Sequence, residues 1–187
     1  MDKLVIVDMQ VDFTTGILEN TDATALLTGI DHLMRHFKGN LVLTRDMHDP
    51  NEFSKSIEGK LLPLHCDPSF GGSKLCRPIR DAFWTWHENN PEASYQIIPK
   101  STFAPQADIF IPGEEIEDSD TIYICGTCTE ICVVSTALKL RSEHPNNRIV
   151  CYANLCAGLT PKSHEAGLIV MENCLIEMED YDYEMVD

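Results

Sequence analysis

Three cysteines follow a short apolar segment in the second half of the chain. Residues 121–124 suit a buried strand, and the run CGTCTEIC, residues 125–132, comes directly after them. Apolar residues then recur at the spacing of an amphipathic helix, at Ile131, Val134 and Leu138. Cys132 would lie in the first turn of that helix, where unpaired N–H groups and the helix dipole favour a thiolate over a thiol. The position suits a nucleophilic cysteine; the alternative is that Cys132 is a small buried hydrophobe, one of eight cysteines.

Two further polar residues end apolar runs elsewhere in the chain. Residues 3–7, KLVIV, suit a strand buried on both faces of a parallel sheet, and Asp8 follows it, while Lys100 follows the short run IIP. At the carboxyl edge of one sheet, Asp8 could take the thiol proton of Cys132 and return it to a leaving group. Lys100 would stabilise both anions. In the alternative interpretation, Asp8 caps a turn and Lys100 is a solvated surface lysine.

Taken together, these segments resemble the isochorismatase-like cysteine hydrolases, and most closely the nicotinamidases and pyrazinamidases. The matching pieces are VIVDMQVDF at 5–13, PKSTF at 99–103 and GTCTEIC at 126–132, and the resemblance spans about residues 1–178. It implies that Asp8 is the proton acceptor and donor and that Lys100 is its electrostatic partner. Cys132 is then the nucleophile, which forms a thioester acyl-enzyme with a small amide substrate.

The resemblance also implies how such a substrate is held. It implies a cis peptide bond between Thr127 and Cys128, and an oxyanion hole made by the backbone amides of Cys128 and Cys132. Phe13 and Phe103 would sandwich a flat ring. Leu62 departs from the nicotinamidase pattern, which has Phe or Trp three residues before a ligand histidine. Leu62 offers only dispersion contact, which leaves open a different heteroaromatic or aliphatic amide as the substrate.

A group of metal-ligating residues follows another buried-strand run, LVLTR at 41–45. Asp46 and His48 come next, and residues two apart in an extended backbone project to the same side. Glu58 and His65 lie further along. Two histidines and two carboxylates can hold Zn²⁺, Fe²⁺ or Mn²⁺ and leave positions open. Taken alone, an aspartate and a histidine two residues apart, such as Asp46 and His48, more often form a hydrogen-bonded pair than a ligand pair.

In the nicotinamidases the corresponding residues bind one divalent metal, and the resemblance implies the ligand set Asp46, His48, Glu58 and His65. Glu52 is the competing third ligand, and Glu58 is preferred for its spacing from His65. The expected metal is zinc, with iron or manganese as alternatives. It would bind the ring nitrogen of a pyridine and orient the amide towards Cys132, as a template rather than as an activator of water.

The positions of these residues require alternating strands and helices. Strands are predicted at 3–8, 40–45, 107–111, 121–125, 148–153 and 174–178, with a weaker pattern at 95–98. Helices are predicted at 22–37, 73–89, 130–143 and 161–172. This alternation predicts a three-layer α-β-α fold with a mostly parallel central sheet and right-handed crossovers. In the long segment 46–72, the other three proposed ligands follow Asp46. Long ordered loops of this kind are often functional.

Composition predicts one hydrolase domain over residues 1–187, with an acidic tail from about residue 179. Fourteen basic residues against 30 acidic ones give a net charge of −16, which argues against nucleic-acid binding. No run of 18 or more apolar residues and no signal-peptide pattern is present, so a cytoplasmic protein without membrane association is expected. Reduced thiols are expected rather than a disulfide framework, with a redox pair at Cys125 and Cys128 as an alternative.

The sequence is also compatible with other activities and assemblies. The second enzyme hypothesis is a metal-poor relative that acts on another small amide or on a carbamoyl compound. A non-catalytic member that only binds a ligand or partner is a third hypothesis, and a redox-sensing thiol protein is a fourth. Trp84 and Trp86 fall in a predicted helix, where they would serve core packing or the contacts of a homo-oligomer.

Overall fold

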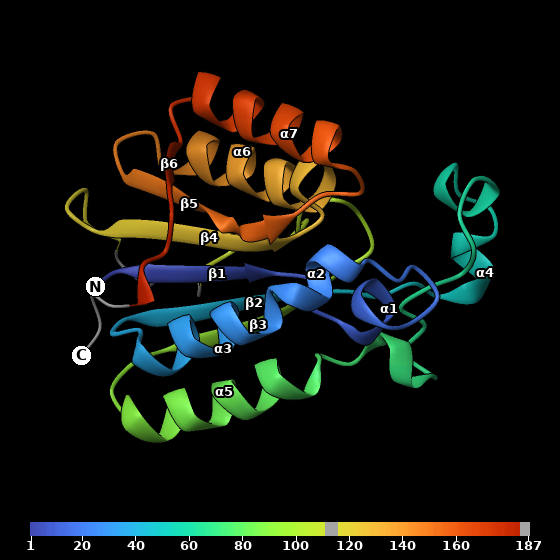
Figure 1. The fold of residues 1–187 in the computed structure, drawn as a ribbon, viewed down its shortest axis with the longest axis horizontal. Coiled ribbons are helices and arrows are strands. Elements are labelled where there is room, and N and C mark those ends of the chain that lie inside the picture. Colours follow the sequence, from blue (N-terminus) through green and yellow to red (C-terminus); the bar gives the residue numbers. More distant parts are fainter. Residues whose placement is uncertain (111–115, 184–187) are drawn as a thin grey trace.

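Six parallel strands form a single sheet at the centre of the molecule (Figure 1). The computed structural model describes residues 1–110 and 116–183. The strand order is β3-β2-β1-β4-β5-β6. The strands are β1 (Lys3–Val7), β2 (Asn40–Asp46), β3 (Tyr95–Lys100), β4 (Thr121–Thr127), β5 (Arg148–Ala157) and β6 (Glu177–Glu179).

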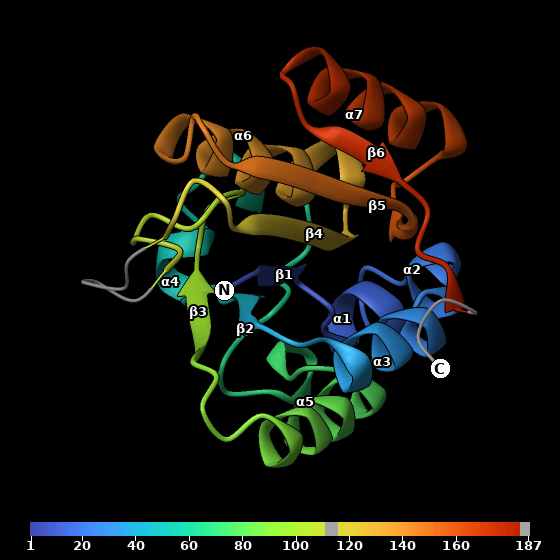
Figure 2. The same ribbon diagram turned by 90° about the vertical axis from the view of Figure 1, so that its left-hand side faces the viewer.

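Helices cover both faces of this sheet, so the three-layer α-β-α prediction is confirmed. Figure 2 shows α3 (Leu27–His36) and α5 (Arg77–Asn89) on one side, and α6 (Val134–Glu143) and α7 (Pro161–Asn173) on the other. The shorter elements are α1 (Val11–Thr14), α2 (Thr21–Ala25), α4 (Pro50–Phe53), the 3₁₀ turns η1 (Glu58–Lys60) and η2 (Gly71–Ser73), and the π-helical turn η3 (Thr129–Val133).

The centre of the sheet is buried on both faces. Strand β1 lies between β2 and β4, and all five of its residues are buried. This explains its continuous apolar pattern, which is typical of interior strands in parallel sheets. At the end of β4, Gly126 has a φ of +127°, and a Cβ there would lie 2.2 Å from the carbonyl oxygen of Val7. Only glycine allows β4 to approach β1 so closely at this edge.

Several predicted boundaries move in the structure. The helix predicted at 22–37 is two helices, α2 and α3, and the side chain of Asn20 caps the first by accepting from the amides of Asp22 and Ala23. The helix predicted at 73–89 begins only at Arg77, with Pro78 in its first turn, where proline is favoured. The helix predicted at 130–143 comprises η3 followed by α6.

One strand prediction was wrong, and another has different bounds in the structure. Residues 107–110 form no strand, and residue 111 lies outside the described residues. Ile109 and Phe110 are nevertheless buried in the core, so the apolar run reflects packing rather than strand pairing. The strand predicted at 174–178 begins later, as β6 at Glu177. Its start is delayed because Cys174 caps α7 and Leu175 has a φ of 63°. The weaker pattern at 95–98 is a real edge strand, β3.

The two tryptophans of α5 differ in burial. Trp86 is fully buried in the core, whereas Trp84 is 53% exposed on the same helix.

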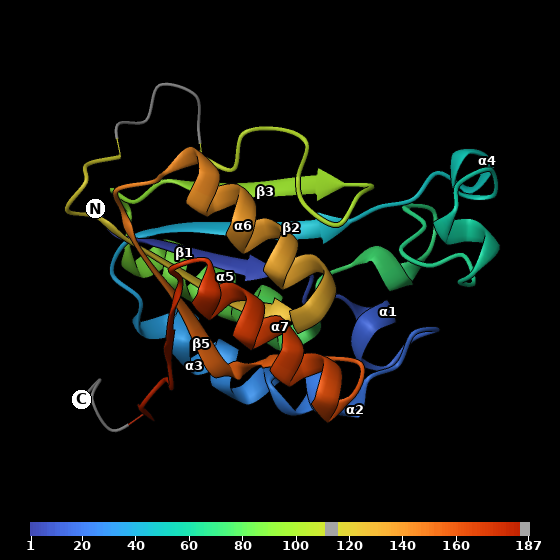
Figure 3. The same cartoon turned by 90° about the horizontal axis from the view of Figure 1, so that it is seen from above.

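Each of the eight cysteines is a free thiol. Within residues 1–110 and 116–183, no helix has the length and apolar character needed to cross a membrane. In Figure 3, the segment around α4 projects beyond the carboxyl ends of β2 and β3.

Candidate functional site

Asp8 lies at the carboxyl edge of the sheet, immediately after β1, and is completely buried. Its backbone has a φ of 49°, an uncommon conformation for a residue other than glycine. The hydroxyl of Thr44, on β2, donates a hydrogen bond of 2.7 Å to Asp8 Oδ1 and accepts one of 3.2 Å from the Asp8 amide. Thr44 therefore fixes one carboxylate oxygen and leaves Oδ2 facing β3.

Lys100 is the last residue of β3 and joins the groups at this edge. Its Nζ lies 2.7 Å from Asp8 Oδ2 and 3.5 Å from Cys132 Sγ. The same nitrogen lies 3.5 Å from Asp46 Oδ1. The side chains of Asp8 and Cys132, far apart in the sequence, thus both lie beside the ammonium group of Lys100.

Burial sets the protonation of these groups. Burial raises the pKa of the Cys132 thiol well above its ordinary value, and the carboxylate of Asp8 raises it further, while Lys100 opposes both. The expectation that the helix start favours a thiolate was therefore wrong for the resting site: the sulfur is deeply buried beside two carboxylates. Burial also raises the pKa of Asp8, against the lowering effect of Lys100. Burial alone would lower the pKa of Lys100, but Asp8 keeps it raised, so the ammonium stays charged.

The nucleophile candidate lies in a π-helical turn, η3, rather than in the first turn of a regular α-helix. The Thr127–Cys128 peptide bond is cis, as the resemblance implied. The carbonyl of Cys128 accepts hydrogen bonds of 3.1 Å from the amides of Ile131 and Val133. This carbonyl is therefore already hydrogen-bonded within the turn. The N–H groups of the turn, rather than its C=O groups, are the candidates for contact with a substrate.

Three of the four predicted metal ligands form a buried cluster. One ligand atom from each of Asp46, His48 and His65 lies within 4.8 Å of the others. His48 Nε2 is 3.0 Å and His65 Nε2 is 3.3 Å from Asp46 Oδ2. Burial by itself would raise the pKa of Asp46, but the hydrogen bonds of both histidines hold it well below its usual range. A carboxylate faced by two imidazoles is a donor set that suits zinc and similar ions.

The orientation of His65 supports this fit. Its Nδ1 lies 3.0 Å from the carbonyl of Pro63, which can only accept, so Nδ1 carries a proton. In neutral His65 the unprotonated Nε2 then faces the Asp46 carboxylate, and two lone pairs confront each other. Either a second proton on the ring or a cation between the two groups resolves this conflict. The residues present therefore fit a metal ion.

The fourth predicted ligand lies at the edge of this cluster. Glu58 Oε1 is 3.8 Å from His65 Nε2, and Glu58 lines the cavity described below. The competing residue, Glu52, is exposed and forms an ion pair of 2.8 Å with Lys55. The geometry favours Glu58 over Glu52. The rings of His48 and His65 also pack against Phe53, with centroids 4.6 and 5.2 Å away, a contact that the sequence did not suggest.

Two polar residues of the segment after β1 hold the ligands from behind, a role that sequence reasoning missed. Gln10 is completely buried, and its Nε2 donates to the carbonyl of Asp46 at 2.8 Å while its Oε1 accepts from the Asp46 amide at 2.7 Å. Asp12 Oδ2 accepts from the amide of Cys66, next to His65, at 2.7 Å. The available signal was the short spacing of two polar residues directly after a buried strand.

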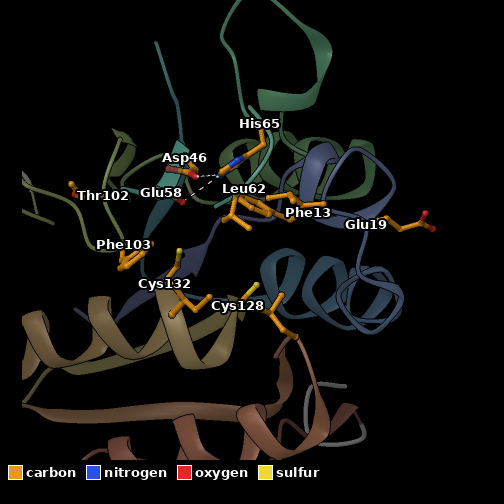
Figure 4. Close-up of a pocket in the computed structure, with 13 residues that line it drawn as sticks. Phe13, Glu19, Asp46, Glu58, Leu62, His65, Thr102, Phe103, Cys128 and Cys132 are labelled. Atoms are coloured by element: carbon orange, nitrogen blue, oxygen red, sulfur yellow. Dashed lines mark ion pairs between the residues drawn. The ribbon is translucent and has the colours of Figure 1, made fainter. Parts of the chain in front are cut away.

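A cavity of about 290 Å³ opens between the thiols and the metal-ligand cluster (Figure 4). Figure 4 shows Cys128 and Cys132 on one wall, with Asp46 and His65 opposite them. All three predicted ring-contact residues line it: Phe13, Leu62 and Phe103. Phe13 is buried and meets His65 edge-on, with centroids 5.6 Å apart. Leu62 and Phe103 are 41% and 49% exposed, which places them at the mouth.

Comparison with known proteins gives a family match and a shared fold. The chain matches the isochorismatase domain over residues 3–181. No curated protein sequence matches it.

Several solved structures share its fold. They include a nicotinamidase/pyrazinamidase from Bacillus subtilis, at 21% identity and a TM-score of 0.75, with 96% of this chain and 100% of that one covered. The pyrazinamidase of Pyrococcus horikoshii, in complex with zinc, has 24% identity and a TM-score of 0.70, with 96% and 99% covered. The yeast nicotinamidase bound to the inhibitor nicotinaldehyde has 22% identity and a TM-score of 0.75, with 97% and 100% covered.

Proposed function

Because the chain belongs to the isochorismatase family of hydrolases, we propose that it is a metal-containing cysteine amidohydrolase of the nicotinamidase type. It would hydrolyse nicotinamide to nicotinate and ammonia through a thioester on Cys132. The observation that carries this proposal is the position of the Lys100 ammonium, within 3.5 Å of both the Asp8 carboxylate and the Cys132 sulfur. An acid, a cation and a thiol around one cavity are the parts that acyl transfer to sulfur requires.

The first step is a proton transfer from Cys132 to Asp8. The raised pKa of the thiol means that it rests protonated, and the raised pKa of Asp8 makes that carboxylate a stronger base. The transfer moves one negative charge from oxygen to sulfur while both atoms remain beside the Lys100 ammonium. The total charge of the buried group does not change, so the step avoids the cost of creating a new buried charge.

The thiolate then attacks the amide carbon. The carbonyl oxygen gains negative charge, and the backbone amides of Cys128 and Cys132 are the donors that we assign to it. Asp8, now protonated, gives its proton to the departing nitrogen, and ammonia leaves. Asp8 then takes a proton from a water molecule, which attacks the thioester and releases the carboxylic acid.

Substrate position depends on the walls of the cavity. Asp46, His48, Glu58 and His65 would hold the metal, and a bound divalent metal would supply a Lewis acid that coordinates the ring nitrogen of a pyridine. The zinc complex of the Pyrococcus horikoshii pyrazinamidase supports zinc as the first metal to test. Phe13 and Phe103 are the residues that we assign to the faces of the ring.

A second candidate function is hydrolysis of another small amide or of a carbamoyl compound by the same three residues. Leu62 favours it, since this side chain lines the mouth of the cavity and gives no aromatic face to a ring.

One experiment separates these candidates. Ammonia release would be measured with nicotinamide, pyrazinamide, an aliphatic amide and a carbamoyl compound, with zinc-loaded enzyme and with Cys174→Ala and Cys132→Ala variants. Cys174 lies at the end of α7, so its variant controls for the loss of a thiol. We expect the largest kcat/KM with nicotinamide and no release by Cys132→Ala. A larger kcat/KM for the aliphatic or carbamoyl compound would replace the first proposal by the second.

A further inference from the structure

A second cavity, of about 360 Å³, lies on the other face of the end of β2. Successive residues of a strand point to opposite faces, and Asp46 lines the first cavity whereas Arg45 lines the second. Four of the eight lining residues are cationic: Arg45, Lys74, Arg77 and Arg80. The others are Val11, Gly71, Leu75 and Ile97. The two cavities are therefore chemically unlike, and the catalytic proposal makes no use of the second.

The second cavity is positively charged, whereas the chain as a whole has a net negative charge. The protein has 30 acidic and 14 basic residues, so basic residues are outnumbered about two to one. None of the residues lining the cavity is acidic. Asp81 is the carboxylate that pairs with its arginines, 3.4 Å from Arg77 and 3.0 Å from Arg80. One carboxylate among four cations leaves an excess of positive charge. No other ion pair within the described part of the chain neutralises these cations.

Part of this charge is held in a fixed position. Arg45 is half-buried, and its Nε and Nη2 donate to the carbonyl of Ser73 at 3.2 and 2.9 Å. A guanidinium has five N–H donors, so this anchoring leaves further donors for a ligand. Arg77 and Arg80 are three residues apart on α5 and therefore neighbours on one face of the helix. The cavity thus has one preset guanidinium and two adjacent ones at its rim.

We propose that this cavity binds a small organic phosphate ester. Guanidinium groups bind phosphate through paired N–H···O bonds, and three of the four cations here are arginines. Val11, Leu75 and Ile97 give the cavity an apolar wall, which would cover the organic part of the ligand and which a free phosphate ion would leave uncovered. The negative field of the whole protein repels anions, so this local cluster provides the attraction that an oxyanion needs.

The ligand would lie close to the candidate metal cluster but separate from it. The carbonyl of Ser73 accepts from Arg45 and also, at 2.9 Å, from Nε2 of Gln10. Gln10 in turn holds both backbone groups of Asp46. The phosphate site therefore adjoins the backbone that supports Asp46, and an occupant there would not enter the cavity that contains Cys132.

The test is calorimetric titration of the intact protein with phenyl phosphate and, separately, with inorganic phosphate. We expect saturable binding of phenyl phosphate, about tenfold tighter than inorganic phosphate because of the apolar wall. The variant Arg77→Ala/Arg80→Ala should weaken phenyl phosphate binding about 100-fold, roughly tenfold for each arginine. The matched control Lys38→Ala/Lys162→Ala removes the same charge from exposed positions outside this cavity and should leave the affinity unchanged.

Three results would overturn the proposal. The first is no saturable binding of phenyl phosphate to the wild-type protein. The second is equal affinity in the wild type and in the double arginine variant, which would place the ligand elsewhere, for example beside Cys132. The third is equal affinity for inorganic phosphate and phenyl phosphate, which would remove the organic ester as the ligand class. Circular dichroism of the arginine variant would establish that it is folded, and Arg45→Met provides a second variant that probes the same cavity.

Discussion

Replacing Lys100 with methionine removes a charge from the centre of the proposed site and keeps most of the apolar stem. The Lys100 side chain is completely buried, and its ammonium lies 2.7 Å from Asp8 Oδ2, whose side chain is completely buried as well. Asp46 keeps His48 and His65 as partners in such a variant, but Asp8 keeps only the hydroxyl of Thr44. The variant therefore leaves one buried carboxylate without a counter-ion.

Removing one partner of a buried ion pair destabilises a protein by about 3–5 kcal/mol, and we expect a loss of that size for Lys100→Met near neutral pH. The loss should depend on pH through Asp8. Burial already raises the pKa of Asp8 in the folded protein, and loss of Lys100 removes the charge that opposes this effect. An acid whose pKa is raised by folding binds more protons in the folded state, so stability falls as pH rises above its unfolded pKa, about 3.9. The difference between variant and wild type should therefore be small near pH 4 and grow towards pH 7.

The assay is urea unfolding of both proteins, with chelator present, at about pH 4.5 and about pH 7.5. Lys139→Met is the matched control, since Lys139 pairs with Glu143 in a partly exposed i,i+4 contact. It should cost less than about 1 kcal/mol at either pH. A loss of less than about 1 kcal/mol for Lys100→Met near pH 7.5, or the same loss at both pH values, would refute the buried pair and the charge balance built on it.

Three other substitutions test the roles of Gln10, Leu62 and Gly126. Gln10→Ala removes both backbone anchors of Asp46 and should weaken zinc binding about 10–100-fold in a chelator competition; unchanged affinity would deny Gln10 a positioning role. Leu62→Phe adds a ring at the mouth of the cavity and should lower the KM for nicotinamide about 2–10-fold in the ammonia assay, whereas an unaltered KM would remove residue 62 from the ring wall. Gly126→Ala places a Cβ 2.2 Å from the Val7 carbonyl oxygen at a φ of +127°. Thermal unfolding should therefore show a loss of stability of more than about 1 kcal/mol. A melting curve like that of the wild type would contradict the tight contact between β4 and β1.

The sequence was sufficient where a pattern had one physical cause. The run KLVIV is apolar because β1 is buried on both faces, and the residue after such a strand lies at the carboxyl edge of the sheet. Asp8 and Lys100 follow from this rule, since each comes at the end of its strand. The resemblance contributed the cis bond at Thr127–Cys128, which spacing and periodicity do not encode.

The sequence was insufficient where two causes give the same pattern. Ile109 and Phe110 are apolar because they pack into the core, and an apolar run cannot by itself distinguish core packing from a strand. The position of Cys132 at a helix start predicted a lowered pKa for its thiol, but its burial beside carboxylates is a property of the folded site and has the opposite effect. The role of Gln10 depends on contacts with residues 36 positions away, which one sequence cannot reveal.

Acid quench of the zinc-loaded enzyme during turnover of nicotinamide tests whether Cys132 carries the acyl group. Mass spectrometry of the peptides then shows which side chain is modified. We expect an acyl adduct on Cys132, no adduct on the other seven cysteines, and loss of both the adduct and ammonia release in Cys132→Ala. Ammonia release at the wild-type rate by Cys132→Ala, or an adduct on another cysteine, would contradict this expectation.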